Sequence, residues 1–285
     1  MDSSQRPVRL ASLSVLGELA SEMLHLVHRL ISNRRVLLVI SRIELKQRYA
    51  GSYLGSLWYP LYWVMLLAMY CFVYVAIFRQ RLPEFGQFGY VLFIFAGLVP
   101  YFGINDAIAS GTSSVRANMA FHRNAVFPVE LIPVKAVLVA LASQAVAVGI
   151  VLLMASAAGF GGWHLLYLPI PFLLEFLLVT GVVWALSAVN VLVPDVQQGI
   201  TLGLWLFLFV SPIGFTIAQV PPGFRWLIWL NPLTYLIEEF RFALLGVRTI
   251  ALMYGLPLLL LISLGSFVLG AIVFGRLMGA FGDYA

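Results

Sequence analysis

The chain has 285 residues, of which 62% are hydrophobic and only 10% are charged, and its mean hydropathy is +0.98. A chain this apolar has its core in lipid, so the composition excludes a soluble globular domain and indicates a polytopic membrane protein. The net charge is +5, but eight of the seventeen Lys and Arg residues precede residue 49. Because that placement is typical of cytoplasmic anchoring beside the first apolar span, it does not indicate nucleic-acid binding.

Residues 1–48 are predicted to form a cytoplasmic segment that ends in an amphipathic helix. The first 20 residues lack an apolar stretch followed by a cleavage site, so we expect no cleaved signal peptide. Between residues 28 and 48, one helical arc is apolar and a basic group lies beside it. The arc holds Val36, Val39, Ile40 and Ile43, and the basic group holds Arg35, Arg42 and Lys46. This pattern favours a helix lying in the inner membrane surface over a simple solvated helix.

Residues 49–285 are predicted to form a permease domain of six membrane-spanning helices. The expected spans are about 56–78, 87–108, 135–158, 167–190, 196–218 and 250–275. Six spans place both termini on one side, and the positive-inside rule assigns twelve Lys and Arg residues to that side against five opposite it. We therefore expect an all-α membrane protein with both termini in the cytoplasm.

The segment 220–246 is expected to form a re-entrant hairpin on the outer side, between the fifth and sixth spans. Pro221, Pro222 and the Asn231-Pro232 pair divide it into pieces too short to span a bilayer. Asn231 is a good N-cap and Gly246 a good stop, so a helix is predicted over 232–245. The alternative is an amphipathic helix lying on the membrane surface.

The predicted hairpin helix is amphipathic. Its apolar face contains Leu233, Leu236, Ile237, Phe240 and Leu244, while Glu238, Glu239 and Arg241 fall mostly off that face. A broken and partly charged hairpin between two apolar spans is typical of the mouth of a membrane pathway. The residues expected at this outer gate are Pro222, Trp226, Asn231, Pro232, Glu238 and Arg241.

The sequence predicts no catalytic residue and no metal site. It lacks a Walker A loop, a His-Glu-x-x-His helix and a Gly-x-Ser-x-Gly elbow, and its one cysteine is Cys71. Two carboxylates fall in or near spans, Glu175 in the fourth and Asp106 near the cytoplasmic end of the second. Because a carboxylate in lipid is costly, each should face a partner or water. A functional and a structural role remain open for Glu175, whereas a structural role is favoured for Asp106.

Aromatic residues form a stripe along the first span. Tyr59, Trp63, Tyr70 and Tyr74 lie within about 60° of one another on a helical wheel, and Tyr62 flanks them. Interfacial enrichment of Tyr explains Tyr59 and Tyr74 but not Tyr70, which lies deeper. Because aromatic faces pack on the C–H faces of sugar rings, we predict that the stripe lines a conduit for a sugar chain. The alternative is that the stripe packs against neighbouring helices.

Three segments resemble the type-2 ABC exporter permeases for bacterial polysaccharides, the group that includes O-antigen and teichoic-acid exporters. Glu44–Trp58 is similar to the family's entry into the first span, and Phe127–Pro133 is similar to its Phe-Pro-x-Glu-Leu-x-Pro loop. Asn231–Glu238 and Phe240–Gly246 are similar to its outer hairpin. The sequence departs from the family pattern at Val129 and Pro194, where an Arg is frequent, and both positions lie on the expected cytoplasmic side.

The resemblance implies a homodimeric permease in the bacterial cytoplasmic (inner) membrane that pairs with two copies of a separate ATP-binding subunit. That subunit would bind ATP and Mg, so no cofactor is expected in this chain. Residues 28–48 would form the interface helix, and residues 113–121 would contain the coupling helix that touches the ATPase. The expected ATPase contacts are Ser113, Ser114, Val115, Arg116, Asn118, Met119 and Phe121. The expected cargo is a lipid-linked polysaccharide resembling O-antigen, passed outward along the dimer axis.

Two other functions stay open. A related type-2 ABC permease for a drug or lipid would use the aromatic stripe only for packing. A stand-alone membrane transferase would need catalytic carboxylates or histidines at a membrane face, where only Asp106 and Glu175 are available, so it ranks last.

Overall fold

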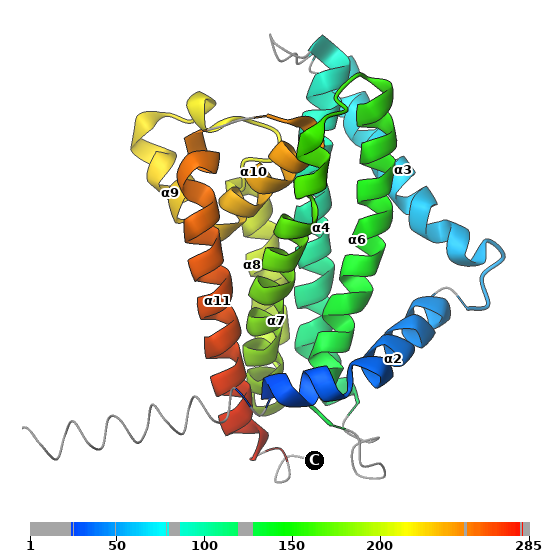
Figure 1. The fold of residues 1–285 in the computed structure, drawn as a ribbon, viewed down its shortest axis with the longest axis vertical. Coiled ribbons are helices and arrows are strands. Elements are labelled where there is room, and N and C mark those ends of the chain that lie inside the picture. Colours follow the sequence, from blue (N-terminus) through cyan, green and yellow to red (C-terminus); the bar gives the residue numbers. More distant parts are fainter. Residues whose placement is uncertain are drawn as a thin grey trace, which may run out of the picture.

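The computed structural model describes residues 24, 26–48, 50–77, 79, 86–118, 128–247, 250–279 and 281. Every regular element in these ranges is a helix, and they contain no strand (Figure 1). The α-helices are α2 (Arg34–Gln47), α3 (Trp58–Cys71), α4 (Gly86–Ala117), α6 (Leu131–Ala157), α7 (Pro169–Leu192), α8 (Val196–Val210), α9 (Arg225–Leu230), α10 (Pro232–Leu245) and α11 (Ile250–Met278). Shorter helical turns are η1 (Gly55–Leu57), η2 (Phe72–Ile77), η3 (Trp163–Tyr167), η4 (Ile217–Gln219) and η5 (Pro222–Phe224).

Five helical stretches are long and apolar enough to cross a membrane, which confirms the prediction of an all-helical membrane protein. They are Gly55–Tyr74, Gly86–Ala117, Leu131–Ala157, Trp163–Leu192 and Gly255–Met278. The fifth predicted span, residues 196–218, contains the shorter helix α8. Its 15 residues rise only about 22 Å, against a hydrocarbon core of about 30 Å.

The helix α8 ends earlier than the sequence pattern predicts, and this part of the prediction is wrong. Ser211 has extended backbone angles, with φ −79° and ψ 139°, and it directly precedes Pro212. A proline disfavours the helical conformation in the residue before it and offers no N–H for a helical hydrogen bond. The apolar run therefore continues past Val210 as non-helical chain, because hydrophobicity alone does not report where a helix ends.

Helices α4, α6, α7, α10 and α11 form the tightly packed part of the molecule. The backbones of α7 and α11 touch, since a Cβ atom added at Gly181 would collide with the Ser266 carbonyl, and one added at Gly270 would collide with the Gly181 carbonyl. Small residues allow such close approach between membrane helices. On α4, a Cβ at Gly111 would likewise collide with the Val183 side chain of α7.

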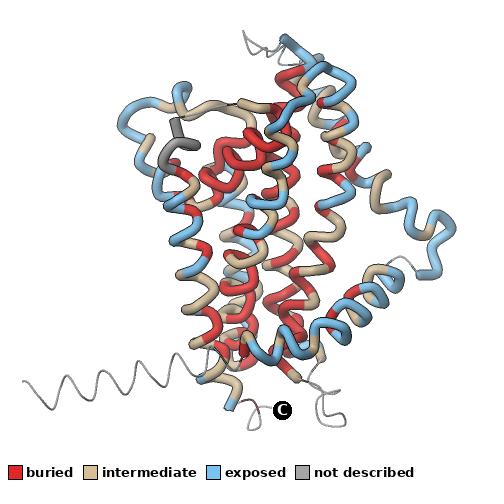
Figure 2. The backbone as a smooth tube through the Cα atoms, viewed as in Figure 1, coloured by how far each residue is buried: buried red, intermediate tan, exposed pale blue. Residues whose placement is uncertain are grey.

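Helices α2 and α3 lie outside this packed part. In Figure 1, α2 lies across one end of the bundle, and α3 runs obliquely from that side toward the other end. Figure 2 shows that both are mostly exposed. The two ends of the described chain lie together, because Leu26 and Phe281 belong to one buried cluster with Val129 and Trp184. The end of the bundle that carries α9 is the opposite one (Figure 1).

Candidate functional site

Helix α10 begins and ends where the sequence predicts, at Pro232 and Leu245. The Asn231 side chain caps its first turn by accepting a 2.9 Å hydrogen bond from the Leu233 backbone N–H. Gly246 terminates the helix in the left-handed conformation, with φ +70°, a region where glycine carries no steric penalty. Its N–H donates to the Phe242 carbonyl oxygen at 2.9 Å. The capping residues therefore confirm the predicted bounds of this helix.

The polar face expected on α10 is not exposed. Every residue from Leu233 to Leu245 is buried, including Glu238, Glu239 and Arg241. These three fall off the apolar face of the helical wheel and are buried nevertheless, because α10 packs against α4, α7 and α11 on several sides at once. The periodicity of one helix does not reveal how many neighbours surround it.

The buried charges of α10 bond to groups in other segments and to one another. Arg241 donates to Glu238 Oε1 at 2.7 Å and lies 3.6 Å above the ring centre of Phe93. Tyr167 of η3 donates its hydroxyl to Glu239 Oε2 at 2.6 Å. The Arg241–Glu238 pair is tolerated because its charges are paired and hydrogen-bonded, whereas Glu239 has the Tyr167 hydroxyl as its partner and no cation among the described residues.

Three side chains hold the non-helical chain that follows α8. Arg241 Nη2 donates to the Ile213 carbonyl at 2.6 Å, Tyr90 donates to the Gly214 carbonyl at 2.8 Å, and Asn231 donates to Ser211 Oγ at 2.9 Å. Non-helical backbone at membrane depth needs such internal partners because lipid offers none. The outer-gate residues Asn231, Glu238 and Arg241 therefore lie together, whereas Pro222 and Trp226 lie in the exposed arm formed by η5 and α9.

A pocket of about 590 Å³ adjoins this clamped segment. It lies between the end of α3 with η2, the first half of α4, and the end of α8 with the chain that follows it. Its lining contains Tyr70, Tyr74, Tyr90, Leu98, Leu208, Phe209, Ser211, Ile213, Gly214, Phe215 and Gln219. Tyr70 stacks on Tyr74 with ring centres 5.9 Å apart, and Tyr74 meets Tyr90 edge-on at 6.2 Å. We call this the tyrosine pocket.

The structure brings together only part of the predicted aromatic stripe. Tyr70 and Tyr74 line the tyrosine pocket, while Trp63 is 4% exposed and packs edge-on against Phe102 at 6.3 Å. Tyr62 is half exposed beside Trp63, and Tyr59 donates its hydroxyl to the Leu45 carbonyl at 2.9 Å. Tyr90, on another helix, is the lining residue that the single-helix pattern missed.

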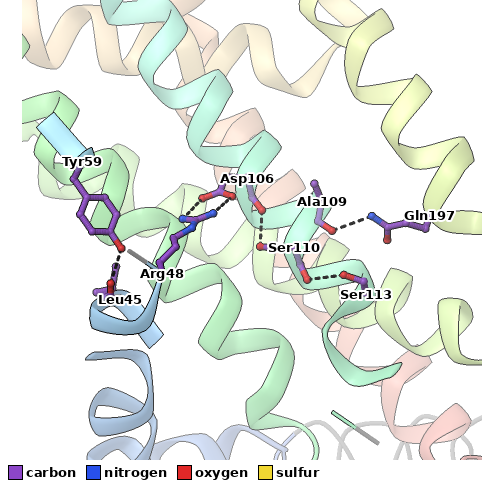
Figure 3. A network of polar contacts seen from close by, with 8 residues as sticks. All are labelled: Leu45, Arg48, Tyr59, Asp106, Ala109, Ser110, Ser113 and Gln197. Carbon is purple, nitrogen blue, oxygen red and sulfur yellow. Dashed lines mark hydrogen bonds and ion pairs between the residues drawn. The ribbon is translucent and has the colours of Figure 1, made fainter. Parts of the chain in front are cut away.

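Helix α2 and the residues next to it are joined to the bundle by three ion pairs. Arg29 bonds Glu130 at 3.1 Å, Lys135 bonds Glu44 at 2.5 Å, and Arg48 makes two hydrogen bonds of 2.8 and 2.5 Å with Asp106. The last pair is drawn in Figure 3, together with the Tyr59–Leu45 bond. Arg48 is the charged partner that the Asp106 carboxylate was expected to need. This pairing agrees with the structural role favoured for Asp106. We call these three pairs the α2 clamp.

The predicted ATPase contacts begin on α4, which continues to Ala117 rather than ending near residue 108. Ser114 and Val115 are buried, Ser113 and Asn118 are half-buried, and Arg116 is exposed. Met119 and Phe121 lie outside the described residues. Of the described members of this set, Arg116 is therefore the residue most accessible to a partner.

The other intramembrane carboxylate is hydrogen-bonded within the bundle. Glu175 on α7 accepts a 2.7 Å bond from the Gln144 side-chain amide on α6, and both residues are fully buried. Gln144 was missed in the sequence, where one amide inside an apolar run was its only signal. At the end of the bundle beside α2, Glu130 of the Phe-Pro-x-Glu motif accepts a hydrogen bond at its carbonyl from Trp184. Among the described residues, no group of three or more His, Cys, Asp or Glu is placed to hold a metal ion.

These features define a helical membrane protein with a capped, buried helix α10 and a tyrosine-lined pocket in the same half of the bundle. Residues 35–245 match the family of ABC-2 type transporters, and the chain belongs to that family. It is 25% identical over 222 residues to the O-antigen export system permease protein RfbA of Myxococcus xanthus, covering 77% of this chain and 84% of that protein. A protein of the same description from Klebsiella pneumoniae is 25% identical over 209 residues, covering 72% and 78%.

Proposed function

We propose that this chain is the transmembrane subunit of an ATP-driven exporter that moves a lipid-linked polysaccharide resembling O-antigen outward across the bacterial cytoplasmic membrane. Family membership supports a transport role, and the names of the similar permeases favour an O-antigen cargo. The tyrosine pocket is the observation that carries the proposal. Its stacked Tyr70 and Tyr74 rings offer faces for sugar C–H groups, and the exposed Gln219 offers a side-chain amide for hydrogen bonds with sugar hydroxyls.

The working unit would be a homodimer with its axis beside α3 and α8. Both helices expose apolar residues. The end of each helix lines the tyrosine pocket, as do η2, which follows α3, and the non-helical chain that follows α8. The exposed set contains Val64, Met65, Met69 and Phe72 on α3 and η2, and Leu202, Trp205, Leu206 and Phe209 on α8. Pairing two copies through these faces would bring their tyrosine pockets toward one axis, where a polymer could pass. The arm formed by α9 and the buried α10 would form the outer gate.

Energy would come from two copies of a cytoplasmic ATP-binding subunit docked at the α2 end. The surface at this end includes exposed Arg116 at the end of α4 and the α2 clamp. Movement of the partner would reach α4 through the Arg48–Asp106 pair and α6 through the Lys135–Glu44 pair. The chain itself would bind no nucleotide, and ATP and Mg would be held by the partner.

The second candidate is a type-2 ABC permease for a drug or a lipid. This alternative uses the aromatic stripe only for packing. Trp63 fits that use, because its ring is buried against Phe102 and is not available to a sugar. The tyrosine pocket favours the polysaccharide, since a purely apolar cargo gains nothing from its polar groups.

Deletion of the gene tests the proposed function. We expect undecaprenyl-linked polymer to accumulate on the inner face of the membrane and surface glycan to disappear, with both effects reversed by the wild-type gene. Normal surface glycan together with new sensitivity to a small amphiphile would instead support the drug or lipid permease. A co-expressed ATP-binding subunit should copurify with the chain and hydrolyse ATP, and the chain alone should not.

A further inference from the structure

A pair of polar side chains lies fully buried where α4, α6 and α7 meet. Glu175 and Gln144 each have 0% exposure, and Gln144 Nε2 donates to Glu175 Oε2 at 2.7 Å. The remaining oxygen of each side chain, Oε1 in both, has no hydrogen-bond partner among the described residues. Two acceptors without a donor therefore remain in one buried pair.

Among the described residues, no cation balances Glu175. The four ion pairs within the described residues are Arg29–Glu130, Arg48–Asp106, Lys135–Glu44 and Arg241–Glu238, and Glu175 takes part in none of them. Burial of an isolated ionised carboxylate in an apolar environment costs far more than burial of a neutral acid. An ionised Glu175 would also leave its Oε1 and Gln144 Oε1 as two acceptors that repel each other.

We propose that Glu175 is a proton-binding site and forms a neutral acid–amide pair with Gln144. A proton on Glu175 Oε1 supplies the single donor that the pair lacks. The acid O–H then donates to Gln144 Oε1, while the Gln144 N–H donates to Glu175 Oε2, so that each side chain gives one hydrogen bond and receives one. The proton comes from water as the helices assemble, and no net charge remains in the bundle.

Helix α4 closes the third side of the pair. A Cβ atom added at Gly103 would collide with Gln144 Oε1 and with its amide carbon, so only glycine leaves room for the amide at this point. The α4 backbone therefore lies directly against the Gln144 amide and fixes its position. The two-point bond in turn holds α6 and α7 in register, which is a positioning role independent of the cargo and of the proposed export function.

Infrared spectroscopy tests the protonation state directly. We expect the wild-type protein to show the C=O stretch of a protonated carboxylic acid, shifted in D₂O, that is missing from Glu175→Gln. In the wild-type minus variant difference spectrum this stretch appears as a positive band. If the band missing from Glu175→Gln is instead that of an ionised carboxylate, the proposal is overturned. Because Glu175→Gln replaces the acid O–H by an amide N–H, this variant should melt within about 2 °C of the wild-type protein.

A reciprocal exchange separates the pair from a simple packing role. Gln144→Glu alone places two acids together, whereas Gln144→Glu combined with Glu175→Gln restores one acid and one amide on opposite helices. We expect the double variant to recover most of the melting temperature lost in the single variant. Failure to recover, or a large loss of melting temperature in Glu175→Gln alone, would show that a negative charge is required at position 175. These measurements need no transport assay, so they stand apart from the outcome for the proposed function.

Discussion

The Arg241 guanidinium donates a 2.6 Å hydrogen bond to the Ile213 carbonyl oxygen and so joins buried helix α10 to the non-helical chain after α8. The same guanidinium bonds Glu238, donates to the Phe93 carbonyl of α4 at 3.3 Å and covers the Phe93 ring. One side chain therefore connects α10 to two segments that line the tyrosine pocket, α4 and the chain after α8. Through this contact, a change in the position of α10 reaches the pocket wall.

Arg241→Leu should destabilise the protein strongly, because it leaves Glu238 as a buried carboxylate without its cation and frees the Ile213 carbonyl. Removing one partner of a buried ion pair costs about 3–5 kcal/mol. Thermal unfolding in detergent or nanodiscs measures the loss. The double variant Arg241→Leu with Glu238→Leu should recover part of it, and a single variant as stable as the wild-type protein would contradict the described pairing.

Gly270→Ala should destabilise α11 against α7, since its new Cβ would collide with the Gly181 carbonyl oxygen. Overpacking of this kind costs about 1–3 kcal/mol. Gly265→Ala is the matched control on the same helix, because a Cβ at Gly265 meets nothing within 4 Å. The control should be neutral or slightly stabilising, as alanine is a better helix former. Equal melting temperatures for the two variants would argue against the close α7–α11 contact.

The α2 clamp should matter more for coupling than for stability. Asp106→Asn removes the charge that Arg48 pairs with at a partly exposed site, where such a pair contributes about 0–1 kcal/mol. We expect a melting temperature close to that of the wild-type protein but a lower rate of export for each ATP hydrolysed by the full complex. An unchanged ratio of export to hydrolysis would remove the α2 clamp from the coupling route.

Replacing Tyr70 and Tyr74 together by Leu should slow export about tenfold or more while ATP hydrolysis continues, because each aromatic contact contributes about 0.5–1.5 kcal/mol and about 1.4 kcal/mol is a factor of ten. The corresponding Phe variants keep the rings and should lose less. Tyr53→Leu is the surface control, since Tyr53 is fully exposed. Export by the double Leu variant at the wild-type rate would assign the two rings to packing alone.

The sequence was sufficient for features that depend on local chemistry. The bounds of α10 follow from Asn231, Pro232 and Gly246, whose capping roles need no tertiary information. The all-helical class follows from the long uncharged runs. Both depend on properties of neighbouring residues along the chain.

Features that depend on packing were not predictable in the same way. The burial of Glu239 and Arg241 requires α4, α7 and α11 to surround α10, and a helical wheel contains no information about those neighbours. Tyr90 joins Tyr70 and Tyr74 from a different helix, and the end of α8 depends on the Ser211-Pro212 pair rather than on hydropathy. The partner of Glu175 lies 31 residues away on α6.

Site-directed photocrosslinking during export tests the proposed conduit most directly. A benzophenone amino acid at position 70, in the exporter complex loaded with the lipid-linked polysaccharide, should form an adduct with the glycan that requires ATP. The same probe at position 261, where Leu261 on α11 is 68% exposed, should label lipid but not glycan. Glycan adducts at position 70 and none at 261 are the predicted result. Export that proceeds without any glycan adduct at position 70 would contradict a path through the tyrosine pocket.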